Sequence, residues 1–221
     1  MPERGDWCVQ ATAFLVRHRS RLHGLAYILL LALARPNDRQ DALAFLLLLL
    51  GFPLRVWAVG SISKDRVLCT WGPYRYTRNP LYLANLLIGA GLVVNANHWL
   101  ATATCAILLG VTYCATIGTE ERQLRELFGE AYIEYCRVTP RLVPCFRPRV
   151  TRCAGTGFEW RRALTAGLVP QTVALVLLMV CMESKEEYLE SRHVAIPMTL
   201  GIAPVDLTPD ADGPEFAGLR R

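Results

Sequence analysis

Apolar residues gather into long blocks in this chain, and this arrangement restricts its possible folds more than any other feature. Hydrophobic residues make up 52% of the 221 residues, and the mean hydropathy is +0.26. A bilayer core of ~30 Å requires a helix of ~20 residues, or slightly fewer where polar flanks reach the interface. The blocks predict an all-α, multi-pass transmembrane helical bundle with about five spans, at residues 22–34, 42–60, 81–94, 100–118 and 163–182.

The positive charges predict how this bundle is oriented. Segments 1–21, 61–80 and 119–162 hold 17 of the 24 Lys and Arg residues, whereas the segments on the opposite side hold 6. Because Lys and Arg favour cytoplasmic loops, the N-terminus and the polar segments within 61–80 and 119–162 are predicted to be cytoplasmic, in a plasma, inner or endoplasmic reticulum membrane. The net charge of +5 is interpreted as this topology plus attraction to anionic lipid, with no nucleic-acid partner.

Composition divides the chain into four parts. We expect a basic amphipathic arm over 1–21, a core over 22–147 whose motifs lie in 54–146, a linker with an extra transmembrane helix over 148–182, and an acidic, partly disordered tail over 183–221. Within the core, 119–128 predicts a short amphipathic helix with Thr119 as its N-cap and Gly129 at its C-terminal end. The eight cysteines contain no CxxC and no zinc-ligand spacing, so no metal site is expected.

The first polar segment precedes the third span. It reads Trp71-Gly72-Pro73-Tyr74, then Arg78-Asn79-Pro80 and Tyr82. Aromatic faces can stack a flat ring or hold a cation, and an arginine can bind a carboxylate through paired hydrogen bonds. The segment therefore suits a flat, polar, partly charged ligand. An interfacial aromatic belt with cytoplasmic cations would explain the composition as well, but not the rigid residue order.

The second polar segment follows the fourth span and begins with Glu120-Glu121. Two spans out and back return it to the membrane face of the first segment, so the two can build one site. Adjacent helical residues point ~100° apart, so one glutamate could face the cleft and bind an ammonium group. The other could lie at the helix N-terminus or, if it is Glu121, pair with Arg125. A solvated first helical turn is the alternative for both.

The two segments together resemble the membrane methyltransferase superfamily that contains isoprenylcysteine carboxyl methyltransferase and the phospholipid N-methyltransferases. The resemblance covers about residues 54–146. Asn79 stands where the isoprenylcysteine enzymes commonly have histidine, a feature closer to bacterial and phospholipid-type members. The matching residues are Gly72-Pro73-Tyr74, Arg78-Asn79-Pro80-x-Tyr82, Gly89-x-Gly91, Glu120-Glu121, Phe128-Gly129-x-x-Tyr132-x-x-Tyr135 and Pro140-Arg141-x-x-Pro144.

The resemblance implies S-adenosylmethionine in a cytoplasmic pocket that the segment after span four covers, with a tunnel to the bilayer for a lipidic or prenylated substrate. The residues that it implies for the cofactor are Tyr74, Pro80, Tyr82, Gly89, Gly91, and Glu120 or Glu121 for its amino group. Those that it implies for substrate or carboxylate binding and catalysis are Trp71, Arg78, Glu121, Tyr132 and Arg141.

The implied reaction is direct methyl transfer, in which an amine acceptor would lose a proton to Glu121 or Tyr132 and a carboxylate acceptor would need no base. Two alternatives remain open. Membrane sterol and steroid reductases share a similar Arg-x-Pro-x-Tyr loop but use NADPH, which would demand more clustered cations. A non-catalytic membrane protein would instead tolerate loss of Arg78 and Glu121.

Overall fold

The computed structural model describes residues 4–35, 41–62, 67–147, 157–165 and 169–191. These residues form helices and contain no strand, which confirms the predicted all-α class. The helices are α1 (Arg4–Leu33), α2 (Asp41–Ser61), α3 (Pro80–Ala96), α4 (Trp99–Phe128), α5 (Glu130–Val138), α6 (Trp160–Ala163) and α7 (Val169–Ser191). A short 3₁₀ turn, η2 (Gly72–Arg75), lies between α2 and α3.

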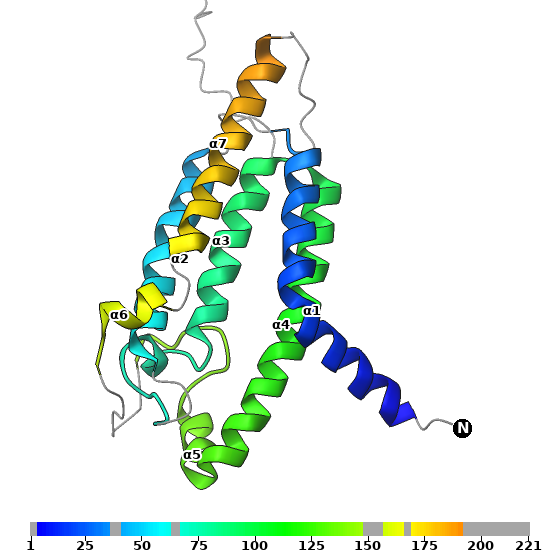
Figure 1. Ribbon diagram of the computed structural model, residues 1–221. Coiled ribbons are helices and arrows are strands. Elements are labelled where there is room, and N and C mark those ends of the chain that lie inside the picture. The colour runs from blue at the N-terminus through cyan, green and yellow to red at the C-terminus, as the bar shows by residue number, and fades with distance from the viewer. Residues whose placement is uncertain (1–3, 36–40, 63–66, 148–156, 166–168, 192–221) are drawn as a thin grey trace, which may run out of the picture.

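The long helices form an upright bundle in which α2 packs chiefly against α3 and α1 against α4 (Figure 1). Small residues allow the close approach of α2 and α3. A Cβ atom added at Gly91 would lie 2.9 Å from the carbonyl oxygen of Ala44, and one at Gly51 would lie 3.0 Å from that of Ala84. The buried core brings together residues of five helices: Ala26, Leu30, Leu48, Leu92, Cys105 and Met182.

Two helices in the described chain are long and apolar enough to cross a bilayer, namely α2 over Ala42–Ser61 and α4. Helix α3 is apolar but shorter. The outer side of α2 exposes large apolar side chains, as expected of a surface that contacts lipid: Leu43, Phe45, Leu46, Leu49 and Leu50. The prediction of five spans stays a prediction.

The turn between α3 and α4 forms where the sequence predicts it. Asn97 takes the left-handed conformation, with φ of 46°, and the side chain of His98 accepts a hydrogen bond from the backbone N–H of Ala101. Helix α4 then runs for 30 residues, about 45 Å, which exceeds the ~30 Å hydrocarbon core. Its last turns therefore carry Glu120 and Glu121 beyond the apolar part of the helix.

The predicted boundary at Thr119 is wrong. Thr119 does not start a helix but lies inside α4, where its hydroxyl donates to the carbonyl oxygen of Ala115 at 3.0 Å. The apolar and amphipathic stretches form one uninterrupted helix, because no proline stands between them and a single glycine, Gly118, is tolerated inside a long helix. The C-terminal end at Gly129 is confirmed by its φ of 51° and by its N–H, which bonds the carbonyl of Arg125 at 2.9 Å.

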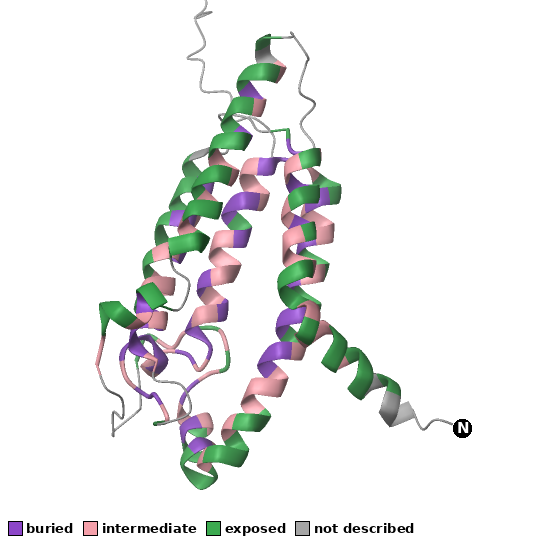
Figure 2. Ribbon diagram, viewed as in Figure 1, coloured by how far each residue is buried: buried purple, intermediate pink, exposed green. Residues whose placement is uncertain are grey.

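Two other boundaries also differ from expectation. The basic arm and the first predicted span belong to a single helix, α1, whose N-terminal part extends away from the bundle and is largely exposed (Figures 1 and 2). The segment predicted as an extra span contains the short α6 followed by α7, and α7 continues through Ser191, past the predicted start of the tail at 183. The rest of that tail lies outside the described residues.

Candidate active site

The two polar segments meet at one end of the bundle, beside α5 and α6 (Figure 1). Backbone hydrogen bonds join them directly: the N–H of Arg78 donates to Pro140 O at 2.9 Å, and that of Cys145 donates to Tyr76 O at 2.8 Å. The buried Tyr135 hydroxyl donates to Tyr74 O at 2.6 Å. These contacts confirm that segments about 60 residues apart in sequence form one structure.

Glycine and proline shape the first segment. Gly72 has φ of 60°, a conformation that side-chain-bearing residues rarely adopt, and a Cβ there would lie 3.0 Å from Ser61 Oγ. Pro73 is the second residue of the η2 turn, and Pro80 is the first residue of α3, both at positions where the missing N–H is not needed. The loop therefore holds Tyr74 and Arg78 in fixed places.

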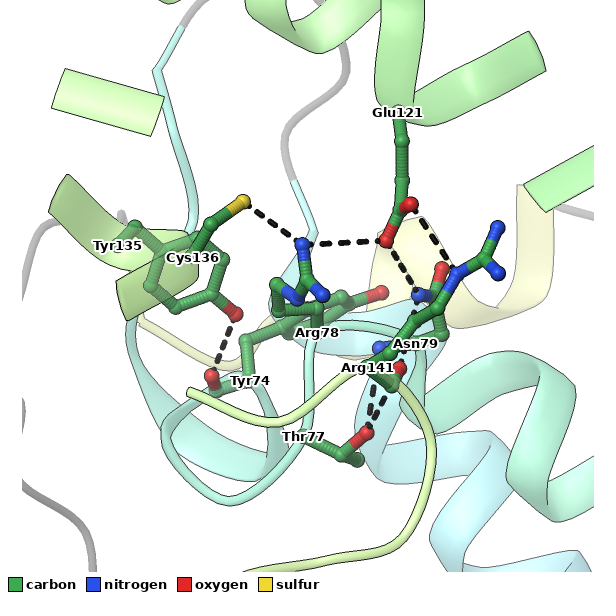
Figure 3. Close-up of polar contacts among 8 residues, drawn as sticks. All are labelled: Tyr74, Thr77, Arg78, Asn79, Glu121, Tyr135, Cys136 and Arg141. Carbon is green, nitrogen blue, oxygen red and sulfur yellow. Dashed lines mark hydrogen bonds and ion pairs between the residues drawn. The ribbon is translucent and has the colours of Figure 1, made fainter. Parts of the chain in front are cut away.

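Glu121 links the two segments to α4. Its Oε1 lies 3.3 Å from Arg78 Nη1, and its Oε2 lies 3.1 Å from Arg141 Nε. The side-chain amide of Asn79 donates to the same Oε1 at 3.4 Å and to Arg141 O at 2.9 Å. Figure 3 shows the carboxylate between the two guanidinium groups. The proposed pairing of Glu121 with Arg125 is thus replaced by ion pairs with both polar segments.

Glu120 faces a different way, as expected for adjacent helical residues. The hydroxyl of Tyr82 donates to its Oε1 at 2.8 Å. Both residues line a cavity of about 310 Å³ between α3, α4 and α5, at the lower end of the range for small-molecule sites. The other polar or aromatic residues that line it are Tyr74, Arg78, Asn79, Gln123, Phe128, Tyr132 and Tyr135.

Six of the residues assigned from sequence line this cavity: Tyr74, Arg78, Pro80, Tyr82, Glu120 and Tyr132. Five others do not: Trp71, Gly89, Gly91, Glu121 and Arg141. Trp71 packs on the cluster of Ala58, Cys69 and Tyr74.

The glycine pair of α3 has a packing role. A Cβ at Gly91 would meet the backbone and side chain of α2, and one at Gly89 would lie 3.1 Å from Leu109 Cδ1 of α4. These contacts account for both glycines without a ligand. Their assignment to the cofactor stays a prediction.

Four residues without an assigned role join the site in the structure. Thr77 is buried, and its hydroxyl donates to the carbonyl oxygens of Arg141 and Leu142 at 3.3 and 3.1 Å. Asn79 bridges Glu121 and the second segment, and Tyr135 anchors the loop. Cys136 Sγ accepts from Arg78 Nη1 at 2.7 Å. The motif spacing placed Asn79 and Tyr135 in the pattern but gave them no function.

Burial and charge set the protonation states in the site. Burial raises the pKa of Tyr132 above 10, and the nearby Glu121 carboxylate raises it further. Burial likewise raises the pKa of Tyr74 and Tyr135. Burial alone would lower the pKa of Arg78, but the adjacent Glu121 carboxylate raises it overall. At neutral pH the site therefore presents protonated phenols and a charged guanidinium.

Two donors in the cavity wall lack partners that satisfy normal hydrogen-bond geometry. These are the hydroxyl of Tyr132 and the Nε–H of Arg78, both buried. Cys136 lies close enough to Tyr132 to affect its pKa, but it does not provide a well-formed bond. Within the described residues, no three His, Cys, Asp or Glu side chains come together as a metal site.

Residues 40–131 match the phospholipid methyltransferase family. Among curated proteins, the chain is similar to the cobalt-zinc-cadmium resistance protein CzcN of Cupriavidus metallidurans, with 36% identity over 59% of this chain and 66% of that protein. It is 30% identical to the nickel-cobalt-cadmium resistance protein NccN of Alcaligenes xylosoxydans xylosoxydans, over 60% of this chain and 67% of that protein.

The protein-S-isoprenylcysteine O-methyltransferase of Schizosaccharomyces pombe is 29% identical over 37% of this chain and 35% of that enzyme. The chain thus spans about two thirds of the two resistance proteins and about a third of the S. pombe enzyme. No solved structure matches it. The family match extends over α2, α3 and α4, which carry the cavity and Glu121, and the chain belongs to the superfamily of integral membrane methyltransferases.

Proposed function

We propose that the chain is an S-adenosylmethionine-dependent methyltransferase whose acceptor is a lipidic or prenylated molecule. The observation that carries this proposal is the cavity of about 310 Å³ that combines one carboxylate, Glu120, with buried unpaired donors on Arg78 and Tyr132. The superfamily implies a methyl donor, and S-adenosylmethionine carries an ammonium, a carboxylate and a flat adenine ring. Each of these groups has a chemical counterpart in the cavity wall.

The cavity residues fit this cofactor in the following roles. Glu120 would bind the ammonium group, held in place by the Tyr82 hydroxyl at 2.8 Å. Arg78 Nε–H and the Tyr132 hydroxyl would donate to the carboxylate or the ribose oxygens. The rings of Tyr74 and Phe128 would contact the adenine or the sulfonium.

Glu121 and Arg141 would act as positioning residues. Neither lines the cavity, but Glu121 fixes Arg78 on one side and Arg141 on the other. Such positioning matters because holding the reacting groups in the right geometry lowers the barrier, and a misplacement of ~1 Å can cost ~100-fold in rate. The chemistry that S-adenosylmethionine supplies when bound is an already activated methyl group, so the protein needs chiefly to align the acceptor and exclude water.

The site favours an acceptor that is already anionic, such as a carboxylate. An amine acceptor must lose a proton, and the two bases considered for that step are poorly suited to it. Tyr132 stays protonated at neutral pH because its pKa is raised, and both oxygens of Glu121 are ion-paired. A carboxylate acceptor requires no base.

The alternative NADPH-dependent reductase finds less support. Among the described residues that line the cavity, Arg78 is the only Lys or Arg, and Glu120 adds a negative charge. A cofactor with three phosphate groups would require several cations at close range.

We also propose that the protein is multi-pass with the N-terminus and the cavity on the cytoplasmic side, as the distribution of Lys and Arg indicates.

The proposal is tested by incubating detergent-purified protein with tritiated-methyl S-adenosylmethionine and either an isoprenylcysteine analogue or an aminophospholipid. We expect label in the organic phase with the isoprenylcysteine analogue, released as methanol by mild alkali as a methyl ester would be. Alkali-stable label on the aminophospholipid would overturn the carboxylate preference. Absence of transfer to either acceptor or to a membrane lipid extract, with NADPH bound instead, would overturn the methyltransferase proposal.

A further inference from the structure

A second cavity, of about 480 Å³, lies higher in the bundle between α1, α2, α3, α4 and α7. It is separate from the cavity with Glu120. The rings of Tyr82 and Tyr113 stand between the two, 5.2 Å apart and nearly perpendicular, with Tyr82 lining the first cavity and Tyr113 the second. None of the roles proposed above uses this second space.

An arginine faces this cavity without an acidic partner. Arg55 lies in α2, six residues before its end at Ser61, about 9 Å inside the apolar helix. Its Nε donates to Gln171 Oε1 at 3.0 Å, and Nη1 donates to Asn85 Oδ1. Both partners are neutral amides, and no ion pair of the described residues includes Arg55. Its positive charge is therefore uncompensated by any described carboxylate.

An uncompensated charge inside an apolar bundle is unfavourable, and in membrane proteins such a residue marks a functional position. Arginine has five N–H donors, and the amide contacts of Arg55 occupy its Nε, Nη1 and Nη2 with one bond each. Two N–H groups remain to bind an anion that enters the cavity. The two amides hold the guanidinium within the bundle, which opposes its extension to the interface.

The lining of the cavity changes from polar to apolar along the bundle. On each of three helices that run away from the first site, the polar residue comes first and the apolar residues follow (Figure 1). His23 precedes Ile28 and Leu31 on α1. Asn85 precedes Ile88 and Leu92 on α3. Gln171 precedes Leu175 and Leu178 on α7. The cavity thus has a cationic, hydrogen-bonding end and a hydrocarbon end.

We propose that this cavity binds a single-chain amphiphile with an anionic head group, a carboxylate or a phosphate, at Arg55 and its hydrocarbon chain between α1, α3 and α7. Part of the site comes from α7, which lies outside the residues 40–131 that match the methyltransferase family. The proposal does not depend on methyl transfer, because it rests on the charge and the shape of a separate cavity.

The test is native mass spectrometry of the full chain in neutral detergent with three ligands of equal chain length: oleate, oleoyl lysophosphatidate and oleyl alcohol. We expect the anionic ligands to bind about tenfold or more tightly than the alcohol, because a bond to a charged group is involved. Preference for oleate or for the lysophosphatidate will distinguish a carboxylate from a phosphate head group.

Arg55→Gln should abolish that preference, whereas Arg125→Gln, at an exposed arginine outside the cavity, should leave it unchanged. Gly24→Phe offers a second variant, since Gly24 lines the cavity and a Cβ there meets nothing within 4 Å. It should block all three ligands without altering Arg55. Equal binding of alcohol and oleate, or unchanged oleate binding in either Arg55→Gln or Gly24→Phe, would overturn the proposal. If Arg55→Gln fails to fold, the ligand series and Gly24→Phe still decide.

Discussion

Replacing Glu121 with glutamine should loosen the site while leaving the cavity wall chemically unchanged. The substitution keeps the size of the side chain and removes the charge that holds Arg78 and Arg141. Because Glu121 does not line the cavity, the loss of its two ion pairs should appear first as a lower free energy of unfolding. It should appear in cofactor affinity only through the position of Arg78.

The size of the effect follows from burial. The side chains of Arg78 and Glu121 are 16% and 19% exposed, so their contact resembles a charged hydrogen bond in a partly dry site and contributes about 1.5–3 kcal/mol. The side chain of Arg141 is 49% exposed, and such surface pairs contribute about 0–1 kcal/mol. Glu121→Gln should therefore lower the free energy of unfolding by about 1.5–4 kcal/mol.

The assay is denaturant unfolding of detergent-purified variants, arranged as two double-mutant cycles. Glu121→Gln is combined with Arg78→Gln in one cycle and with Arg141→Gln in the other. Glu126→Gln, at an exposed position on the same helix, serves as a control and should change stability by less than about 0.5 kcal/mol. A coupling energy for Arg141 equal to or larger than that for Arg78 would refute the argument from burial.

Three further predictions concern packing and protonation. Gly91→Ala should be strongly destabilising in thermal unfolding because its Cβ meets backbone 2.9 Å away, whereas Gly89→Ala should be tolerated because it meets only the end of a leucine side chain; equal effects would contradict the packing role. Tyr135→Phe should lower the free energy of unfolding by about 1–3 kcal/mol, because it leaves the Tyr74 carbonyl unpaired; an unchanged midpoint would show that the 2.6 Å bond contributes little. The raised pKa of Tyr132 means that the unfolded chain ionises first, so its contribution to stability is present below about pH 10 and is lost above it; Tyr132→Phe should reduce this alkaline loss in a pH series of unfolding, and an identical alkaline profile would contradict the shift.

The sequence predicted the parts of the structure that depend on local pattern. Apolar blocks predicted the helices, and the interval between the predicted spans 81–94 and 100–118 contains the observed turn at Asn97, which brings the two polar segments together. These predictions succeeded because helix formation and the return of a hairpin follow from composition and length. Glu120, Tyr82 and Tyr74 were assigned to the cofactor through the resemblance to the methyltransferase superfamily; all three line the cavity, and their binding role stays a prediction.

Other features depend on which face of a helix meets which neighbour, and a single sequence does not determine this. The choice between Glu120 and Glu121 as the cavity residue required the rotation of α4 about its axis. The packing role of Gly91 required the position of α2. The helix boundary at Thr119 was misjudged because a threonine inside a helix can bond its own preceding turn, as this one does with Ala115.

Cofactor binding at Glu120 is tested by isothermal titration of S-adenosylmethionine into the purified wild-type chain and into Glu120→Gln, with Glu126→Gln as the matched control. We expect binding by the wild type and the control, and affinity reduced by about tenfold or more in Glu120→Gln, because the ammonium loses its charged partner. Absence of binding by folded wild-type protein, or equal affinity in all three proteins, would contradict cofactor binding at Glu120.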